Sequence, residues 1–207
     1  ILIGLVGSEM CIRDSSLVDI CNSALNQLGA STIISLTENS KNARIISQRF
    51  DSVRDQVFRE HPWNALTKRI KLAQDSQAPV YEFSFAYTLP SDCLKVLSFS
   101  DSTSEYLAKN DINYKIENGK LLTSSSVVYL KYIARETDTS KYDSSLSETI
   151  SAALAADIAY AITGSTTVMQ LFEGKYKEKL KDARFADATE GMPEELDADF
   201  PFIASRY

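Results

Sequence analysis

Apolar residues recur every three or four positions in four stretches of the chain, the spacing that places side chains on one face of a helix. These stretches predict helices at Ser16–Leu28, Asn39–His61, Ser147–Ile162 and Thr166–Thr189. The side chains expected to face a shared core are Leu17, Ile20, Cys21, Ala24, Leu25, Leu28, Ala43, Ile46, Phe50, Val53, Val57, Ile150, Leu154, Ile158, Ala161, Val168, Phe172, Tyr176, Leu180 and Ala183. Gly29, Pro62 and Gly164 mark helix ends, because glycine suits a C-cap and proline biases the preceding residue out of the helical region.

In the middle third of the chain, the three-to-four-residue spacing of apolar positions is lost. β-branched and aromatic residues are frequent from Val80 to Ala134, and the Asn-Gly pair in ENGK, Glu117–Lys120, is typical of a tight hairpin turn. The pattern therefore predicts an α+β protein that is mainly α. We expect a four-helix bundle made of residues 15–79 and 135–190, with one small antiparallel β region, residues 80–134, between the second and third helices.

Both ends of the chain lack a helix or strand period. Met10–Ser15, MCIRDS, is the translation of ATG TGT ATA AGA GAC AG(C/T), which resembles a transposon adapter used in sequencing libraries. We therefore interpret residues 1–14 as non-native read-through; the alternative is a genuine N-terminal strand. Residues 191–207 are predicted to form an extended C-terminal arm, acidic first and aromatic last. Its apolar side chains are expected to bind a partner, or else to fold back on the bundle: Phe200, Phe202, Ile203 and Tyr207.

Composition argues against several kinds of site. Cys11, Cys21 and Cys93 are far apart and none lies near the single histidine, His61, so neither a zinc site nor a disulfide is expected. No cofactor is predicted. The 22 basic and 28 acidic residues give a net charge of −6, which argues against tight binding to a phosphate backbone. No apolar stretch is typical of a membrane span.

The segment FREHPWNALTKR, Phe58–Arg69, holds the only histidine and the only tryptophan of the chain. His61 is a candidate general base, because imidazole is the side chain most often used for proton transfer near neutral pH. The sequence does not supply the catalytic partners that a general base needs, however. It shows no nucleophile motif, no carboxylate pair at recognisable spacing and no second metal ligand. We therefore predict a structural corner in which His61 and Pro62 close the second helix and Trp63 plugs the space between the helical and β regions. No catalytic residue is assigned, and no enzymatic activity is expected.

Four blocks follow one another along the chain: NSALNQLGA (Asn22–Ala30), VRDQVFREHPWN (Val53–Asn64), LPSDCLKVL (Leu89–Leu97) and the alanine-rich SETISAALAADIAYAIT (Ser147–Thr163). In this order they make the chain, from Ser16 to about Ala188, resemble the tail tubular protein A family of short-tailed, podovirus-type bacteriophages. The resemblance implies a structural virion protein, the head-to-tail adaptor, with a helical bundle, a β region and no cofactor. It also implies synthesis in the cytoplasm of a host bacterium and a final place in the virion tail, at the head-tail junction.

The resemblance further implies a set of partners. Copies of the chain would form a ring, dodecameric in similar adaptors, between the portal protein and a tail nozzle protein similar to tail tubular protein B. Viral DNA would pass through the ring, and no membrane would be bound. The acidic balance fits such a conduit, because like charges repel phosphate. Two other hypotheses stay open: a cell-wall glycan hydrolase, which needs two carboxylates across a cleft, and a small helical regulatory module.

Overall fold

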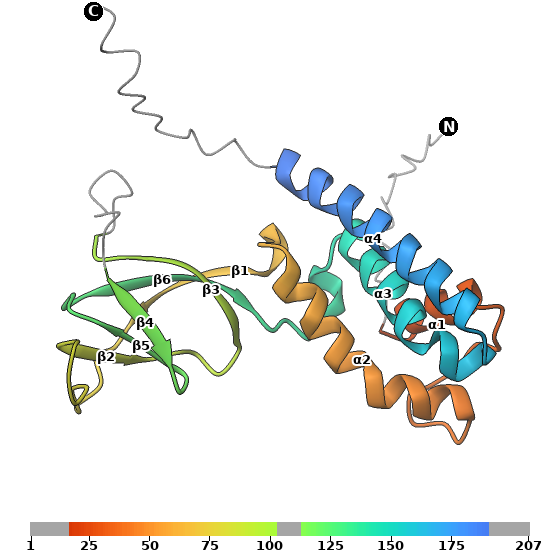
Figure 1. Cartoon of the computed structure of the whole chain (residues 1–207), viewed down its shortest axis with the longest axis horizontal. Coiled ribbons are helices and arrows are strands. Elements are labelled where there is room, and N and C mark those ends of the chain that lie inside the picture. Colours follow the sequence, from red (N-terminus) through yellow and green to blue (C-terminus); the bar gives the residue numbers. More distant parts are fainter. Residues whose placement is uncertain (1–16, 103–112, 191–207) are drawn as a thin grey trace, which may run out of the picture.

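The computed structural model describes residues 17–102 and 113–190 of the 207-residue chain. The predicted read-through, residues 1–14, lies outside the described residues, and so does the predicted C-terminal arm with Phe200, Phe202, Ile203 and Tyr207. The described part has two lobes, one built from helices and one from strands (Figure 1). The chain passes from the helical lobe into the β lobe and later returns, so the helical lobe contains both early and late residues.

Four helices form the first lobe, and they lie where the apolar spacing predicts them. They are α1 (Leu17–Gln27), α2 (Lys41–Glu60), α3 (Ser144–Thr163) and α4 (Thr166–Thr189). The side chains of Ser40, Asp143 and Ser165 each accept a hydrogen bond from a backbone N–H in the first turn of α2, α3 and α4, respectively. Gly164 ends α3 in the left-handed conformation, with φ of 68°, which glycine adopts without steric cost.

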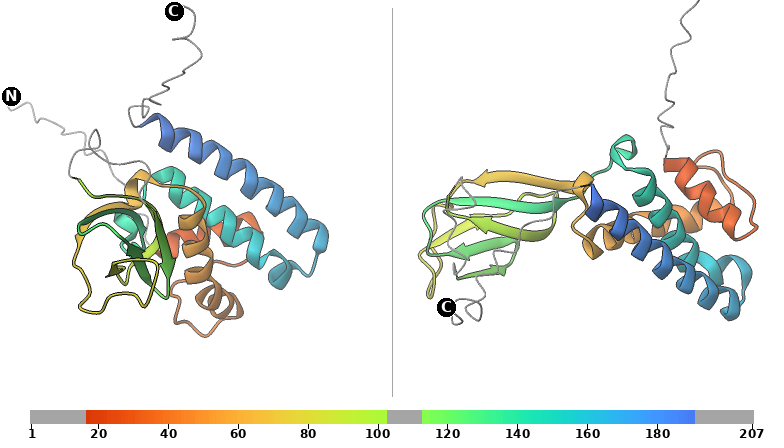
Figure 2. Two further views of the ribbon diagram at one scale, coloured as in Figure 1. Left: turned by 60° about the vertical axis from the view of Figure 1, so that its left-hand side comes forward. Right: turned by 90° about the horizontal axis from the view of Figure 1, so that it is seen from above.

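The central helix of this lobe is α3, and α1, α2 and α4 all pack against it (Figures 1 and 2). Alanines on α3 allow these close approaches, and five of them are buried: Ala152, Ala153, Ala155, Ala156 and Ala159. The core also takes in Trp63, Leu66 and Ile133 from outside the helices. Within the described ranges, no helix has both the length and the apolar character needed to cross a bilayer.

The second lobe contains two three-stranded antiparallel sheets. One has the order β1-β6-β3, with β1 (Thr67–Leu72), β3 (Cys93–Ser100) and β6 (Val128–Ala134); the other has the order β2-β5-β4, with β2 (Phe85–Thr88), β4 (Tyr114–Glu117) and β5 (Lys120–Thr123). The predicted fold, a helical bundle with one small β region, is therefore wrong in its architecture, although the protein is α+β.

The reason is that the strands bury a core of their own. Residues from both sheets form it: Leu72, Tyr87, Leu121, Val128, Leu130, Tyr132 and Ala134. A core built from side chains of two sheets stabilises a separate lobe, so the strands do not serve merely to cover the helical bundle. The predicted hairpin is present, since Asn118 and Gly119 between β4 and β5 both have positive φ, 48° and 71°.

The strand that the sequence pattern missed is β1. It begins at Thr67, ahead of the expected start at Val80 and within residues assigned to the bundle. Its sequence, TKRIKL, is half basic because β1 is an edge strand with most of its residues exposed. A mostly exposed strand has little apolar alternation, so the period-two signal is weak there.

Candidate functional site: the joint at His61 to Trp63

The predicted corner lies at the joint where α2 leads into β1. His61 follows the last residue of α2 and has an extended backbone, with φ of −139° and ψ of 149°, as expected for a residue before proline. Asn64–Leu66 then form a short 3₁₀ turn, η1, and β1 starts at Thr67. The hydroxyl of Thr67 donates to the carbonyl oxygen of Trp63 at 2.8 Å, which fixes the turn.

The indole of Trp63 is completely buried in the helical core. Its Nε1–H donates to the carbonyl oxygen of Val57 at 3.0 Å, so the polar atom of the ring is satisfied. The imidazole of His61 meets the indole edge to face, with ring centroids 4.9 Å apart. Trp63 thus belongs to the core of the helical lobe, which also includes Leu66 and the β6 residue Ile133.

His61 contacts a carboxylate that the sequence pattern did not single out. Its Nε2 lies 3.0 Å from Oδ2 of Asp187, a residue in the last turn of α4 that is only 4% exposed. The backbone N–H of Asn64 donates to Oδ1 of the same carboxylate at 3.0 Å, and its side-chain amide donates to the Asp187 carbonyl at 2.8 Å. Asp187 therefore ties the end of α4 to the corner. One signal points to it: Asp187 lies four residues after the buried Ala183, on the inward face of α4.

The end of α2 is also held by side chains from both lobes. The last carbonyl groups of a helix lack intrahelical partners. Here Lys95 of β3 donates to the carbonyl of Arg59 at 3.1 Å, and Arg184 of α4 donates to the carbonyl of Glu60 at 3.0 Å. Both donors are cations, which suit the negative end of the helix dipole.

Two further hydrogen bonds complete the joint. The Arg59 guanidinium donates to the Leu94 carbonyl of β3 at 2.5 Å. The phenol of Tyr176 donates to Oε2 of Glu60 at 2.8 Å. The pKa of Tyr176 is raised well above its ordinary value, mainly by burial and secondly by this contact with Glu60. The phenol therefore stays protonated and remains a donor.

Three carboxylates meet at the same place, and their oxygens lie within 4.8 Å of one another: Asp143, Asp187 and Glu190. Oxygen ligands of this kind suit hard divalent cations. Two of the three already have partners, because Asp143 accepts the backbone N–H of Leu146 at the start of α3 and Asp187 binds the corner. Helix capping accounts for the position of Asp143, and the contacts with the corner account for the position of Asp187.

As a general base, His61 would need a nucleophile or a bound water to deprotonate. In the parts of the chain that the structure describes, its polar contact is Asp187, and no serine or cysteine side chain is hydrogen-bonded to it. Cys21, for its part, is buried in the helical core, and burial raises the pKa of its thiol to about 12. The arrangement at the corner is that of a satisfied structural joint.

Comparisons with known proteins add no assignment: no protein-family model matches the chain, and the search of curated proteins found no match.

Proposed function

We propose that the protein is a head-to-tail adaptor of a short-tailed bacteriophage, similar to tail tubular protein A, and that it forms a ring between a portal protein and a tail nozzle. The ordered sequence blocks from Asn22 to Thr163 support this proposal. The structural observation that carries it is the distribution of exposed apolar side chains, which occur on both lobes. A protein that contacts copies of itself and two different neighbours needs several such surfaces.

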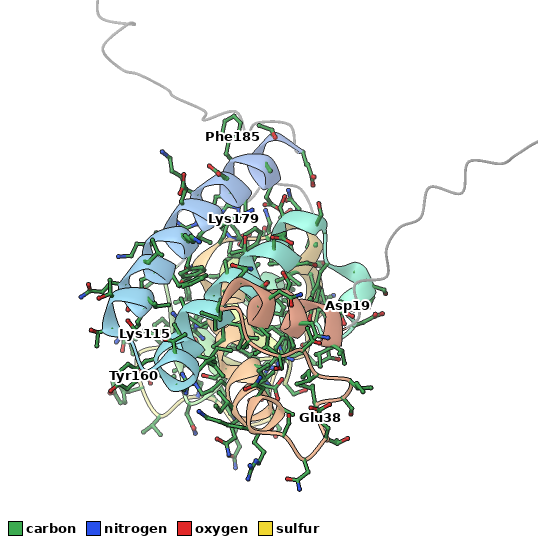
Figure 3. The ribbon with its side chains drawn as sticks, turned by 90° about the vertical axis from the view of Figure 1, so that its right-hand side faces the viewer. Asp19, Glu38, Lys115, Tyr160, Lys179 and Phe185 are labelled. Carbon is green, nitrogen blue, oxygen red and sulfur yellow. The ribbon has the colours of Figure 1, made fainter. Side chains whose placement is uncertain are left out.

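The first of these surfaces is the outer face of α4. Leu171, Glu178 and Phe185 follow one another at seven-residue intervals, so they lie on one line along the helix, away from its buried side. Leu171 is 57% exposed and Phe185 is 73% exposed. Figure 3 shows Phe185 at one end of α4, directed away from the bundle. Covering side chains of this size is worth roughly 1.5–3 kcal/mol each, and we assign this face to contacts between copies in the ring.

The second surface is the loop between β1 and β2. Val80 is 98% exposed and Tyr81 is 79% exposed. They line a pocket of about 310 Å³, together with the β4-β5 turn. Figure 1 shows β2 at the end of the β lobe that is remote from the helices, so this loop is well separated from α4. We assign it to a neighbour other than a second copy.

The alternatives have weaker support. A glycan hydrolase needs an acid and a second carboxylate facing each other across a cleft. In the joint, the carboxylates of Asp143 and Asp187 are used for capping and for binding the corner. A small helical regulatory module does not account for a lobe made of two sheets. We accordingly expect no turnover of glycan, peptide or nucleotide.

Native mass spectrometry and cryo-EM of the full chain, alone and with a portal protein, test the proposal. A large defined ring is expected, and the double variant L171S/F185S should shift it to smaller species. Lys177 lies on α4 off the Leu171–Phe185 line, so K177S serves as the matched control and should leave the ring intact. A chain that stays monomeric in both preparations would refute the adaptor function. A ring that survives L171S/F185S would retain the adaptor but reject the α4 interface.

A further inference from the structure

The outer face of the β1-β6-β3 sheet carries a small array of hydrogen-bond donors. Partners in an antiparallel sheet point to the same face, and the register forms two rows across the three strands: Arg69, Lys131 and Ser98, then Lys71, Tyr129 and Ser100. The opposite face carries the apolar residues Leu72, Val128 and Leu130 of the β core. The array therefore faces away from that core.

Two cations of this array have no counter-ion among the described residues. Arg69 and Lys71 are exposed, and in residues 17–102 and 113–190 neither forms an ion pair with a carboxylate. The Lys71 ammonium instead lies 5.7 Å from the ring centroid of Tyr129. Lys68, on the other face of the same strand, is paired with Asp92 at 3.0 Å. Adjacent positive charges without partners favour an anionic occupant.

The strand that bears these cations also has an open edge. Within the described residues, β1 pairs only with β6, so its other side offers backbone N–H and C=O groups to an extended chain. An acidic extended segment would satisfy both the free edge and the unpaired cations.

We propose that the segment Glu194–Asp199 of the same chain lies extended along β1, with Glu195, Asp197 and Asp199 facing Arg69 and Lys71. The segment, EELDAD, contains four carboxylates and no basic residue. In an extended chain, alternate residues point to the same side, so the three acids at positions 195, 197 and 199 share a side. Their two-residue spacing equals the spacing of Arg69 and Lys71 on β1.

The segment is also within reach. Asp187 is hydrogen-bonded to Asn64, and the N–H of Glu190 donates to the Asp187 carbonyl, so the chain after α4 starts beside the turn that leads into β1. Figure 2 shows the end of α4 next to the start of β1. Arg69 is five residues beyond Asn64, and Glu195 is five residues beyond Glu190. At about 3.3 Å per extended residue, both chains cover comparable distances from a common origin.

This contact is independent of the adaptor function, since it lies within one chain. It would leave the aromatic residues that follow position 199 beyond the segment held on β1. Viral DNA is the other polyanion that the cations could attract. The own-chain segment is favoured because its charges are tethered next to β1 and match its spacing, whereas a net charge of −6 opposes binding to DNA.

Zero-length carbodiimide cross-linking of the full chain, followed by peptide mass spectrometry, tests the proposal because it joins a lysine to a carboxylate in contact. Lys71 should be linked to Glu195, Asp197 or Asp199. Mixing isotope-labelled and unlabelled chains separates links within one chain from links between copies. The yield should fall about five-fold in R69E, because this substitution replaces an attraction between opposite charges by a repulsion between like charges. K177E, with the same charge change on α4, should leave the yield unchanged.

Two further measurements test whether the link depends on charge attraction in a folded protein. Adding E195K to R69E should restore the link from Lys71 to Asp197 or Asp199, and unchanged melting temperatures show that the variants are folded. In the unaltered chain, about 0.5 M sodium chloride should lower the yield, because the screening length falls to a few ångströms. Links only between different copies, links only to the α4 lysines, or a yield unaffected by R69E would overturn the proposal. So would absent links together with DNA binding that R69E/K71E abolishes.

Discussion

Replacing Trp63 with alanine should strongly destabilise the helical lobe. A buried aromatic side chain covers roughly 150–250 Å², which at about 25 cal/mol per Å² corresponds to roughly 4–6 kcal/mol. Alanine keeps part of this burial, and the structure around the site relaxes only partly, so the expected loss is about 3–5 kcal/mol. This expected loss of stability rests on the full burial of Trp63 in the core shared by α2 and α3.

Thermal unfolding followed by circular dichroism at the helical band measures the effect. For a chain of this length, each kcal/mol of lost stability lowers the melting temperature by about 2–4 °C, so the melting temperature should fall by about 6–20 °C. W63F keeps most of the apolar contact but loses the hydrogen bond to Val57, and should cost about 1–2 kcal/mol. Y160A is the control, because Tyr160 is 55% exposed on the same lobe. A W63A variant that melts within about 2 °C of the unaltered chain would show that the plug is wrong.

Three other changes probe the joint, a helix end and the β lobe. D187A leaves His61 and the Asn64 N–H without their shared acceptor and should cost about 1–3 kcal/mol in urea unfolding; D187N should recover part of the loss. G164A should cost about 1 kcal/mol in the same assay, because φ is 68° while no atom lies within 4 Å of the added Cβ. Burial and the nearby Asp92 raise the pKa of Tyr132 from 10.0 to about 12, so the stability contributed by this phenol should be complete below pH 10 and lost as the pH rises toward 12. Y132F should flatten that alkaline decline, and equal declines in both proteins would contradict the assignment.

The helices could be located from the sequence because their apolar faces are long and buried. The expected inward residues Ile46, Phe50 and Val57 of α2 are all buried, and Gly164 ends α3 at the expected place. The division of the strands into two sheets could not be predicted in the same way. Strand pairing depends on contacts between distant residues, such as Thr67 with Ile133, which period-two patterns do not encode.

The joint was only half visible in the sequence. His61, Pro62 and Trp63 stand out locally because of their residue types and the effect of proline on the backbone. Asp187 does not, since it lies 126 residues from His61 and its role comes from the packing of α4 against α3. Its signal was an acidic residue on an otherwise apolar inward face, where a carboxylate needs partners.

The way the joint is built bears on the adaptor proposal. Each lobe has its own core, with Ile133 of β6 shared into the helical one, and the polar contacts at the end of α2 also set the relative orientation of the lobes. There Arg59 and Lys95 connect α2 to β3, while Glu60 binds two side chains of α4 and His61 binds a third. Directional hydrogen bonds of this kind fix an angle better than apolar contacts, which tolerate sliding. The proposed adaptor would need such an angle, because its α4 face and its β1-β2 loop would each meet a different neighbour at a set position.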